Sequence, residues 1–217
     1  MLKEAYFTPE TLPQKSRALL DSLGELRRRR GFTFQARQSA LLVLDLQEYF
    51  LDPASHAFIP SAPTILPGIR SLIAAWYASQ SLVVFTRHVN TPQAAGRMGV
   101  WWRDLIAPGS ASSAITQSLD TSSGIVLEKS QYDAFYATPL EELLRARSVT
   151  QVVICGVMTH LCCETTARSA FMRGFEVFFT VDGTATYHEA FHKASLLNLA
   201  HGFAVPVLVE EVLQGVR

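Results

Sequence analysis

The stretch QVVICGVMTHLCCETTARSAFMRGFEVFFTVDG, residues 151–183, holds two apolar runs on either side of an amphipathic segment. The runs at 151–157 and 175–183 are predominantly apolar, which is typical of strands buried on both faces of a sheet. The segment between them, 159–174, is long enough for a helix and ends at Gly174, a residue type that commonly follows helices. This order predicts two parallel strands joined by a covering helix.

The same alternation continues over the chain after residue 38. Further strands are predicted at 40–46, 81–88, 124–130 and 204–212, and further helices at 64–80, 138–148 and 188–202. The predicted fold class is therefore α/β, with three α/β/α layers around a mostly parallel, Rossmann-like sheet of roughly six strands. We expect residues 1–38 to form an N-terminal arm and residues 39–217 to form one domain.

Composition excludes several classes of protein. Lys+Arg and Asp+Glu both number 19, and this balance argues against a nucleic-acid partner or a membrane surface. No apolar run approaches the roughly 20 residues of a membrane span. The three cysteines fall within nine positions, too close together to tie distant segments, so we expect a reducing, cytoplasmic setting.

Chemically reactive side chains stand where the predicted strands end. Asp45 ends the first strand, His88 the second and Lys129 the third, and Gly156 leads into the helix that carries Cys162. Ligands of open parallel sheets bind outside the carboxyl ends of the strands. The topology therefore predicts that an acid, a cation and a thiol converge there.

Cys162 is a candidate nucleophile. A thiol near a helix N-terminus has its thiolate favoured by the helix dipole, and a neighbouring Lys129 would lower its pKa further. A carboxylate such as Asp45 could take the thiol proton and pass it to a leaving amine. A cysteine beside an apolar strand is more often a small buried hydrophobe. We interpret Cys155 in that way, whereas the pattern alone leaves Cys162 evenly divided between the two roles.

Three segments resemble the isochorismatase-like hydrolases, a superfamily that includes nicotinamidases, N-carbamoylsarcosine amidases and isochorismatases. They are LLVLDLQEYF (41–50), VLEKSQYDAF (126–135) and VVICGVMTHLCCETTARSAFMRGFEVFFTVDGTA (152–185). The resemblance covers about residues 38–210. It implies catalytic roles for Asp45, Lys129 and Cys162, a cis peptide between Val157 and Met158, and an oxyanion hole formed by the N–H groups of Met158 and Cys162.

The resemblance also implies a pocket for a small-molecule substrate. Its expected lining residues are Phe50, His88, Arg97, Trp101, Tyr132, Phe135 and Met158. Arg97 is a candidate carboxylate clamp, and a solvated loop charge is an equal alternative. Nicotinamidases bind a metal through an Asp and several His, and here only His88 matches, so we predict no metal and no cofactor. A homo-oligomer is a family-level expectation.

The family offers two reactions. In the first, Cys162 cleaves a C–N bond, amide or carbamoyl, through a thioester intermediate. In the second, Asp45 acts as general acid in hydrolysing the vinyl ether of isochorismate to a dihydroxybenzoate precursor and pyruvate. Isochorismatases commonly carry Gly at the nucleophile position, so Cys162 favours C–N hydrolysis. A scaffold protein that kept the fold is a third alternative, which the intact Asp45, Lys129 and Cys162 disfavour.

Overall fold

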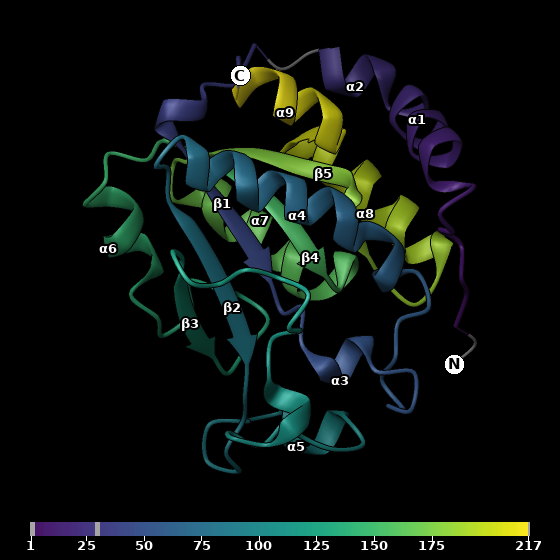
Figure 1. The fold of residues 1–217 in the computed structure, drawn as a ribbon, viewed down its shortest axis with the longest axis vertical. Helices are drawn as coiled ribbons and strands as arrows, with labels where there is room; N and C mark the ends of the chain where they lie inside the picture. The colour runs from purple at the N-terminus through teal and green to yellow at the C-terminus, as the bar shows by residue number, and fades with distance from the viewer. Residues whose placement is uncertain (1–2, 29–30, 217) are drawn as a thin grey trace.

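Six parallel strands form the centre of the molecule, in the order β3-β2-β1-β4-β5-β6 (Figure 1). The computed structural model describes residues 3–28 and 31–216. The strands are β1 (Ser39–Leu44), β2 (Val83–His88), β3 (Ile125–Lys129), β4 (Gln151–Val157), β5 (Glu176–Ala185) and β6 (Val205–Val207). This sheet, covered by helices, confirms the predicted α/β fold class.

Helices cover both faces of the sheet, with α4 in front of it and α7 behind it in the view of Figure 1. The helices are α1 (Leu12–Ser22), α2 (Gly24–Arg28), α3 (Glu48–Leu51), α4 (Ala62–Ala78), α5 (Met98–Trp101), α6 (Leu140–Arg145), α7 (Glu164–Met172), α8 (Glu189–Gly202) and α9 (Val209–Val216). Three shorter turns are η1 (Ala36–Gln38), η2 (Ala111–Ser113) and the π-helical η3 (Thr159–Cys163). None of the helices within the described ranges is long and apolar enough to cross a lipid bilayer.

The end of the chain differs from its prediction as a strand over 204–212. The strand β6 is short, and helix α9 follows it. Apolar residues recur at helical spacing at Val209, Val212 and Leu213. A helix places these three side chains on one face, which can be buried, whereas a strand would divide them between its two faces. The carboxylate of Asp182 also accepts a hydrogen bond from the Val209 N–H, at 2.8 Å, which caps the helix.

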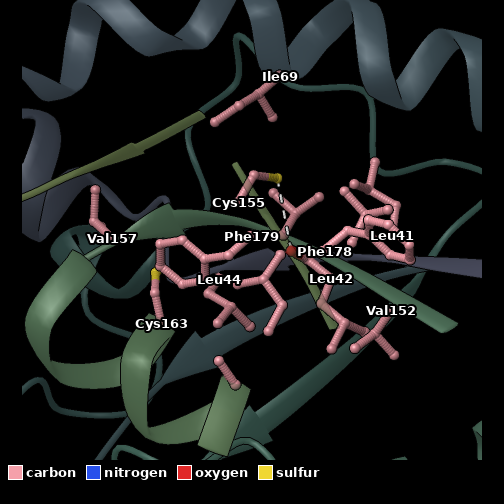
Figure 2. Close-up of a cluster of buried hydrophobic side chains, with 14 of the residues drawn as sticks. Leu41, Leu42, Leu44, Ile69, Val152, Cys155, Val157, Cys163, Phe178 and Phe179 are labelled. Atoms are coloured by element: carbon pink, nitrogen blue, oxygen red, sulfur yellow. Dashed lines mark hydrogen bonds between the residues drawn. The ribbon is translucent and has the colours of Figure 1, made fainter. Parts of the chain in front are cut away.

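The core consists mainly of the apolar strand residues and the helix faces that cover them (Figure 2). Every residue of β1 and of β4 is buried. Cys155 is fully buried there, and its thiol lies 3.6 Å from the carbonyl oxygen of Leu42, which confirms its interpretation as a small buried residue. Cys163 is buried in the same core. The two cysteines are therefore packing residues.

Residues of the N-terminal arm pack onto the sheet domain. The buried side chains of Tyr6, Phe7, Leu19, Leu20 and Leu23 join the main hydrophobic core. The arm is thus attached between residues 6 and 23 by the burial of apolar surface. Where the arm ends and the domain begins stays a prediction.

Candidate active site

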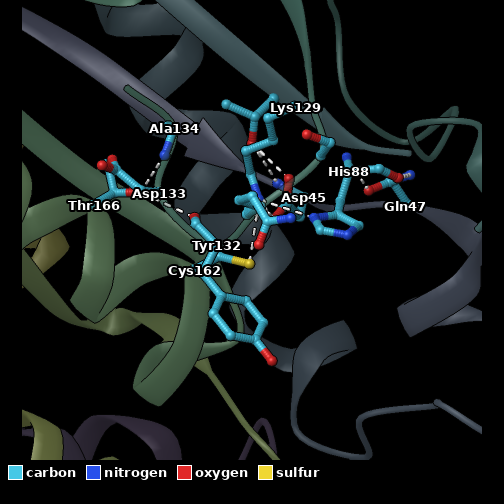
Figure 3. Close-up of polar contacts among 12 residues, drawn as sticks. Asp45, Gln47, His88, Lys129, Tyr132, Asp133, Ala134, Cys162 and Thr166 are labelled. Carbon is cyan, nitrogen blue, oxygen red and sulfur yellow. Dashed lines mark hydrogen bonds and ion pairs between the residues drawn. The ribbon is translucent and has the colours of Figure 1, made fainter. Parts of the chain in front are cut away.

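The carboxyl ends of β3, β2, β1 and β4 bring four reactive side chains together, as the sequence predicts. His88 and Lys129 are the last residues of neighbouring strands and are partners in the sheet register. Asp45 follows β1 directly, and Cys162 lies in η3 after β4. We call Asp45, His88, Lys129 and Cys162 the strand-end cluster (Figure 3).

The Lys129 ammonium lies at the centre of the strand-end cluster. Its Nζ is 2.7 Å from Asp45 Oδ2, 3.3 Å from Cys162 Sγ and 3.3 Å from His88 Nδ1, and it donates to the carbonyl oxygen of Gln131 at 3.0 Å. Figure 3 shows Asp45, His88 and Cys162 arranged around the ammonium. The side chains of Asp45 and Lys129 are both completely buried, so each compensates the charge of the other in a region that excludes water.

The backbone at Asp45 directs its carboxylate toward the cluster. Asp45 has a φ of 53°, in the left-handed region that Asp adopts more readily than most residues. Thr86 donates from Oγ1 to Asp45 Oδ1 at 2.6 Å and fixes the second carboxylate oxygen. Behind this turn, a Cβ added to Gly156 would lie 2.1 Å from the carbonyl oxygen of Leu44. Only glycine therefore allows β4 to approach β1 this closely.

The charge states of this group follow from its burial and its neighbours. Burial alone would raise the pKa of Asp45. The charge of Lys129, together with His88 and the hydrogen bonds from Cys162 and Lys129, outweighs burial and holds the pKa below the ordinary value of 3.8. Burial opposes the charged form of Lys129, but Asp45 and Cys162 together overcome this and raise the pKa of the ammonium. The pair is therefore a carboxylate and an ammonium at neutral pH.

The pKa of the Cys162 thiol is shifted in the direction opposite to the prediction. Burial raises the pKa of the Cys162 thiol to about 12, and the negative charge of Asp45 adds to this, while Lys129 offsets only part of it. The thiol is thus protonated at neutral pH, beside an ionised carboxylate. The helix terminus and the lysine both favour the thiolate through their charge, but the cost of burying a thiolate is larger.

His88 has both ring nitrogens engaged. Its Nε2 lies 2.7 Å from Asn90 Oδ1, which can only accept, so Nε2 carries the proton and Nδ1 accepts from Lys129. Asn90 is fixed in turn by donation from Nδ2 to the carbonyl oxygen of Ser130, at 2.8 Å. Burial and the Lys129 charge lower the pKa of His88, so the imidazole is neutral.

These contacts do not fit a metal ion. Within residues 3–28 and 31–216, one group of possible ligand atoms lies close together: those of Asp45, His88 and Cys162, all within 4.8 Å of one another. Their common partner is the Lys129 ammonium, a cation already in the position that a metal would take. The nitrogen lone pair of His88 is directed to that ammonium as well.

A cavity of about 330 Å³ opens above Cys162. Its walls are mostly apolar and aromatic. They consist of Lys3, Tyr49, Phe50, His56, Ala57, His88, Asn90, Met98, Trp102, Arg103, Asp104, Leu105, Ile106, Tyr132, Met158, Leu161, Cys162 and Tyr187. Asp45 and Lys129 lie beneath the cavity wall and do not line it. Of the three predicted catalytic residues, Cys162 is therefore the one that faces a ligand.

The cavity includes four of the seven predicted lining residues, namely Phe50, His88, Tyr132 and Met158. The peptide between Val157 and Met158 is cis, and Met158 lies between β4 and η3, directly before the turn that carries Cys162.

The predictions for Arg97, Trp101 and Phe135 are wrong. Trp101 is 76% exposed and Arg97 is exposed at the start of α5, so both face solvent. Phe135 is buried and stacks on Phe175, with ring centroids 6.0 Å apart. In place of these three, Trp102 and Arg103 line the cavity, because the chain leaves the helix after Trp101 and turns inward.

Several contributors to the site carry no distinct sequence signal. Gln47 donates to the carbonyl oxygens of His88 and Ser113 and so ties β2 to the loop over 89–123. Trp102 Nε1 donates to the Tyr132 hydroxyl at 2.8 Å. The sequence could have identified Thr86 as a site residue, because it stands two positions before His88 on the same face of the same strand. Lys3 could not have been identified in this way, because no local sequence pattern relates it to the other residues that line the cavity.

The chain is similar to known proteins over most of its length. Residues 39–211 match the isochorismatase domain. Nicotinamidase 3 of Arabidopsis thaliana is 42% identical over 171 residues, which cover 76% of this chain and 82% of that protein. Maleamate amidohydrolase of Pseudomonas putida is 26% identical, over 83% of this chain and 88% of that protein. The crystal structure of a cysteine hydrolase from Pseudomonas syringae pv. phaseolicola superposes with a TM-score of 0.82 at 25% identity, covering 85% and 95% of the two chains.

Proposed function

Because the chain belongs to the isochorismatase family, and relatives along most of its length are amidohydrolases, we propose that it cleaves a C–N bond of a small molecule with Cys162 as nucleophile. The observation that carries this proposal is the contact set of Lys129, whose ammonium bridges the Asp45 carboxylate and the Cys162 sulfur below an apolar cavity. The bond cleaved is an amide or a carbamoyl C–N bond. The substrate is a small molecule that the cavity can enclose.

The first step forms a thioester. Asp45 accepts the thiol proton as Cys162 Sγ bonds to the carbonyl carbon, so the thiolate exists only while it is reacting. The carbonyl electron pair moves to oxygen. The N–H groups of Met158 and Cys162 stabilise this oxyanion, since the first amides of a helical turn lack partners within the helix. The C–N bond then breaks, and the leaving nitrogen takes the proton from Asp45.

Hydrolysis of the thioester uses the same groups in reverse. Asp45, again a carboxylate, accepts a proton from water as the water oxygen bonds to the thioester carbon. The C–S bond breaks, and the sulfur recovers the proton. Lys129 keeps its charge throughout and holds the anionic side of each step in place. The carboxylic acid product leaves through the cavity.

Substitution of Cys162 distinguishes this reaction from vinyl-ether hydrolysis. Cys162→Ala should lower amide hydrolysis by more than about thousandfold, because the variant cannot form a thioester. Cys163→Ala is the matched control, since Cys163 is buried in the core and does not line the cavity, and it should retain activity. Release of ammonia from a panel of amides, beginning with nicotinamide and maleamate, measures both variants. Retained turnover by Cys162→Ala, above all on isochorismate, would favour Asp45 as a general acid instead.

Two further properties are part of the proposal. The free thiols of Cys155, Cys162 and Cys163 support a reducing, cytoplasmic setting. Exposed apolar side chains on α7 and α8, which include Phe171, Met172 and Leu197, support a homo-oligomer that covers them.

A further inference from the structure

The N-terminal arm contributes a cation to the wall of the active-site cavity. Lys3 lines the cavity, and its ammonium lies 4.4 Å from the centre of the Tyr187 ring and donates to the carbonyl oxygen of His56. Both of these neighbours also line the cavity. The family match begins at residue 39, so Lys3 lies outside the segment that the family shares.

The position of Lys3 is fixed by its neighbours in the arm. The Glu4 N–H donates to the Tyr187 carbonyl oxygen at 2.8 Å, and Glu4 Oε1 lies 2.9 Å from His188 Nε2. The Glu4 carboxylate also accepts from the Glu189 N–H at 3.0 Å, at the start of α8. Further along, Tyr6 is buried, with its hydroxyl 3.2 Å from His192 Nδ1. Lys3 and the residue that follows it, Glu4, are therefore both anchored to the domain.

A second cation, Arg103, lines the same cavity from the loop that follows α5. Neither Lys3 nor Arg103 forms an ion pair with any carboxylate in the described parts of the chain. The carboxylate that lines the cavity, Asp104, pairs with two other lining residues: it accepts from Tyr49 Oη at 2.5 Å and lies 3.4 Å from His56 Nε2. Two cations thus face an otherwise mostly apolar cavity without a protein anion as partner.

We propose that Lys3 and Arg103 form an anion-recognition site in the active-site cavity and that the substrate is an amide that also carries a carboxylate. The inference rests on the proposed function and names its substrate class. The apolar and aromatic walls hold the body of the substrate, the amide lies at Cys162, and the carboxylate lies at the two cations. Lys3 makes the N-terminal arm a determinant of specificity.

Binding tests the site without requiring turnover. The acceptor is the Cys162→Ala variant, and the ligands are 3-carbamoylbenzoate and its neutral counterpart isophthalamide, with succinamate and succinamide as a shorter pair. Calorimetry should show at least one acid binding about tenfold or more tightly than its diamide, and added NaCl should weaken the binding of that acid alone. Equal affinity within both pairs, or no detectable binding of either acid, overturns the site.

Substitutions locate the recognition in the two cations. Lys3→Met and Arg103→Gln should each weaken binding of the acid about tenfold and leave the diamide unchanged, in protein of unchanged melting temperature. Lys193→Met is the matched control, because Lys193 lies on α8 outside the cavity and pairs with Glu189. It should change neither affinity. Loss of acid and diamide binding together in Lys3→Met would show a general packing role and contradict the proposal.

Turnover separates this inference from the proposed function. If the acids bind selectively but no amide is hydrolysed by the unmodified protein, the anion site stands and the hydrolase proposal fails. If amides are hydrolysed with equal kcat/KM for acids and diamides, the hydrolase proposal stands and the anion site fails.

Discussion

The strand-end cluster and the outer wall of the cavity are built in different ways. In the cluster, Asp45 and Lys129 are fully buried and each is held by several contacts from neighbouring strands. In the outer wall, Lys3, Trp102 and Arg103 come from the N-terminal arm and the loop over 89–123, and they are partly or largely exposed. The proposed chemistry thus depends on the sheet, whereas the proposed selectivity depends on segments that can vary without disturbing the sheet.

This difference determines what a substitution should do. Removal of one partner from a buried, charged group leaves an uncompensated charge, so stability and activity should fall together. Removal of a polar contact near solvent leaves a group that water can satisfy, so only substrate binding should change.

Asp45→Asn should have the largest effect. The amide cannot accept the thiol proton, so turnover should fall by about 10²- to 10⁴-fold. The Lys129 ammonium would stay buried without its counter-charge, so the free energy of unfolding should fall by about 3–5 kcal/mol. Steady-state kinetics and urea denaturation measure the two effects.

Asp182→Asn is the control for that variant. Asp182 is a half-buried carboxylate that caps α9 and does not line the active-site cavity. It should lose about 1 kcal/mol of stability and no activity. An Asp45→Asn enzyme with turnover within tenfold of the parent would contradict the assigned role of Asp45.

The pH dependence of cysteine alkylation should show the buried character of the cluster. Because burial and Asp45 raise the pKa of Cys162 to about 12, its alkylation by iodoacetamide should rise about tenfold per pH unit through pH 9. Turnover should stay constant from pH 5 to 8, since the Asp45 pKa lies below 3.8 and the carboxylate is already ionised. Peptide mass mapping assigns the modified cysteine.

The sign of the stability effect follows from the same shift. A carboxyl group whose folded-state pKa is lowered contributes stability above its ordinary value of 3.8 and loses it as the pH falls through the lower folded-state value. The strand-end cluster should therefore stay intact as the pH is lowered to 5. A plateau of the alkylation rate below the pKa of about 8.5 of a free thiol would contradict the protonated resting form.

Trp102→Phe should have the smallest effect. It removes the hydrogen bond from Trp102 Nε1 to the Tyr132 hydroxyl, which is worth about 1 kcal/mol, so KM should rise about fivefold with kcat unchanged. Trp101→Phe is the matched control, because Trp101 is 76% exposed and outside the cavity, and it should change neither constant. A larger effect from Trp101→Phe would show that the loop adopts another arrangement when substrate binds.

The same contrast explains which residues could be predicted. Continuous apolar runs give the strands, and parallel strands bring Asp45, His88 and Lys129 to one edge wherever the loops lie. The outer wall has no such rule. The loop over 89–123 carries two adjacent tryptophans, and one backbone turn after α5 decides that Trp102 and not Trp101 faces the cavity. Lys3 depends on contacts with residues more than 50 positions away.

The direction of the Cys162 pKa shift was mispredicted for a related reason. The sequence places a cation and a helix terminus near the thiol, and both favour a thiolate. Burial depends on how the whole site packs, and it proves the larger effect. The strand prediction over 204–212 failed similarly. Two residues beyond the end of β6, the same apolar spacing fits helix α9, which packs on α4.

The most direct measurement is acid quenching of the enzyme during turnover of an amide that it hydrolyses, followed by mass analysis of the peptide that contains Cys155, Cys162 and Cys163. We expect an acyl group, with the mass of the substrate less its leaving amine, on Cys162 alone. The adduct should be absent from Cys162→Ala and present in Cys163→Ala. Full turnover without an adduct, sustained in Cys162→Ala, would contradict the nucleophilic role of Cys162.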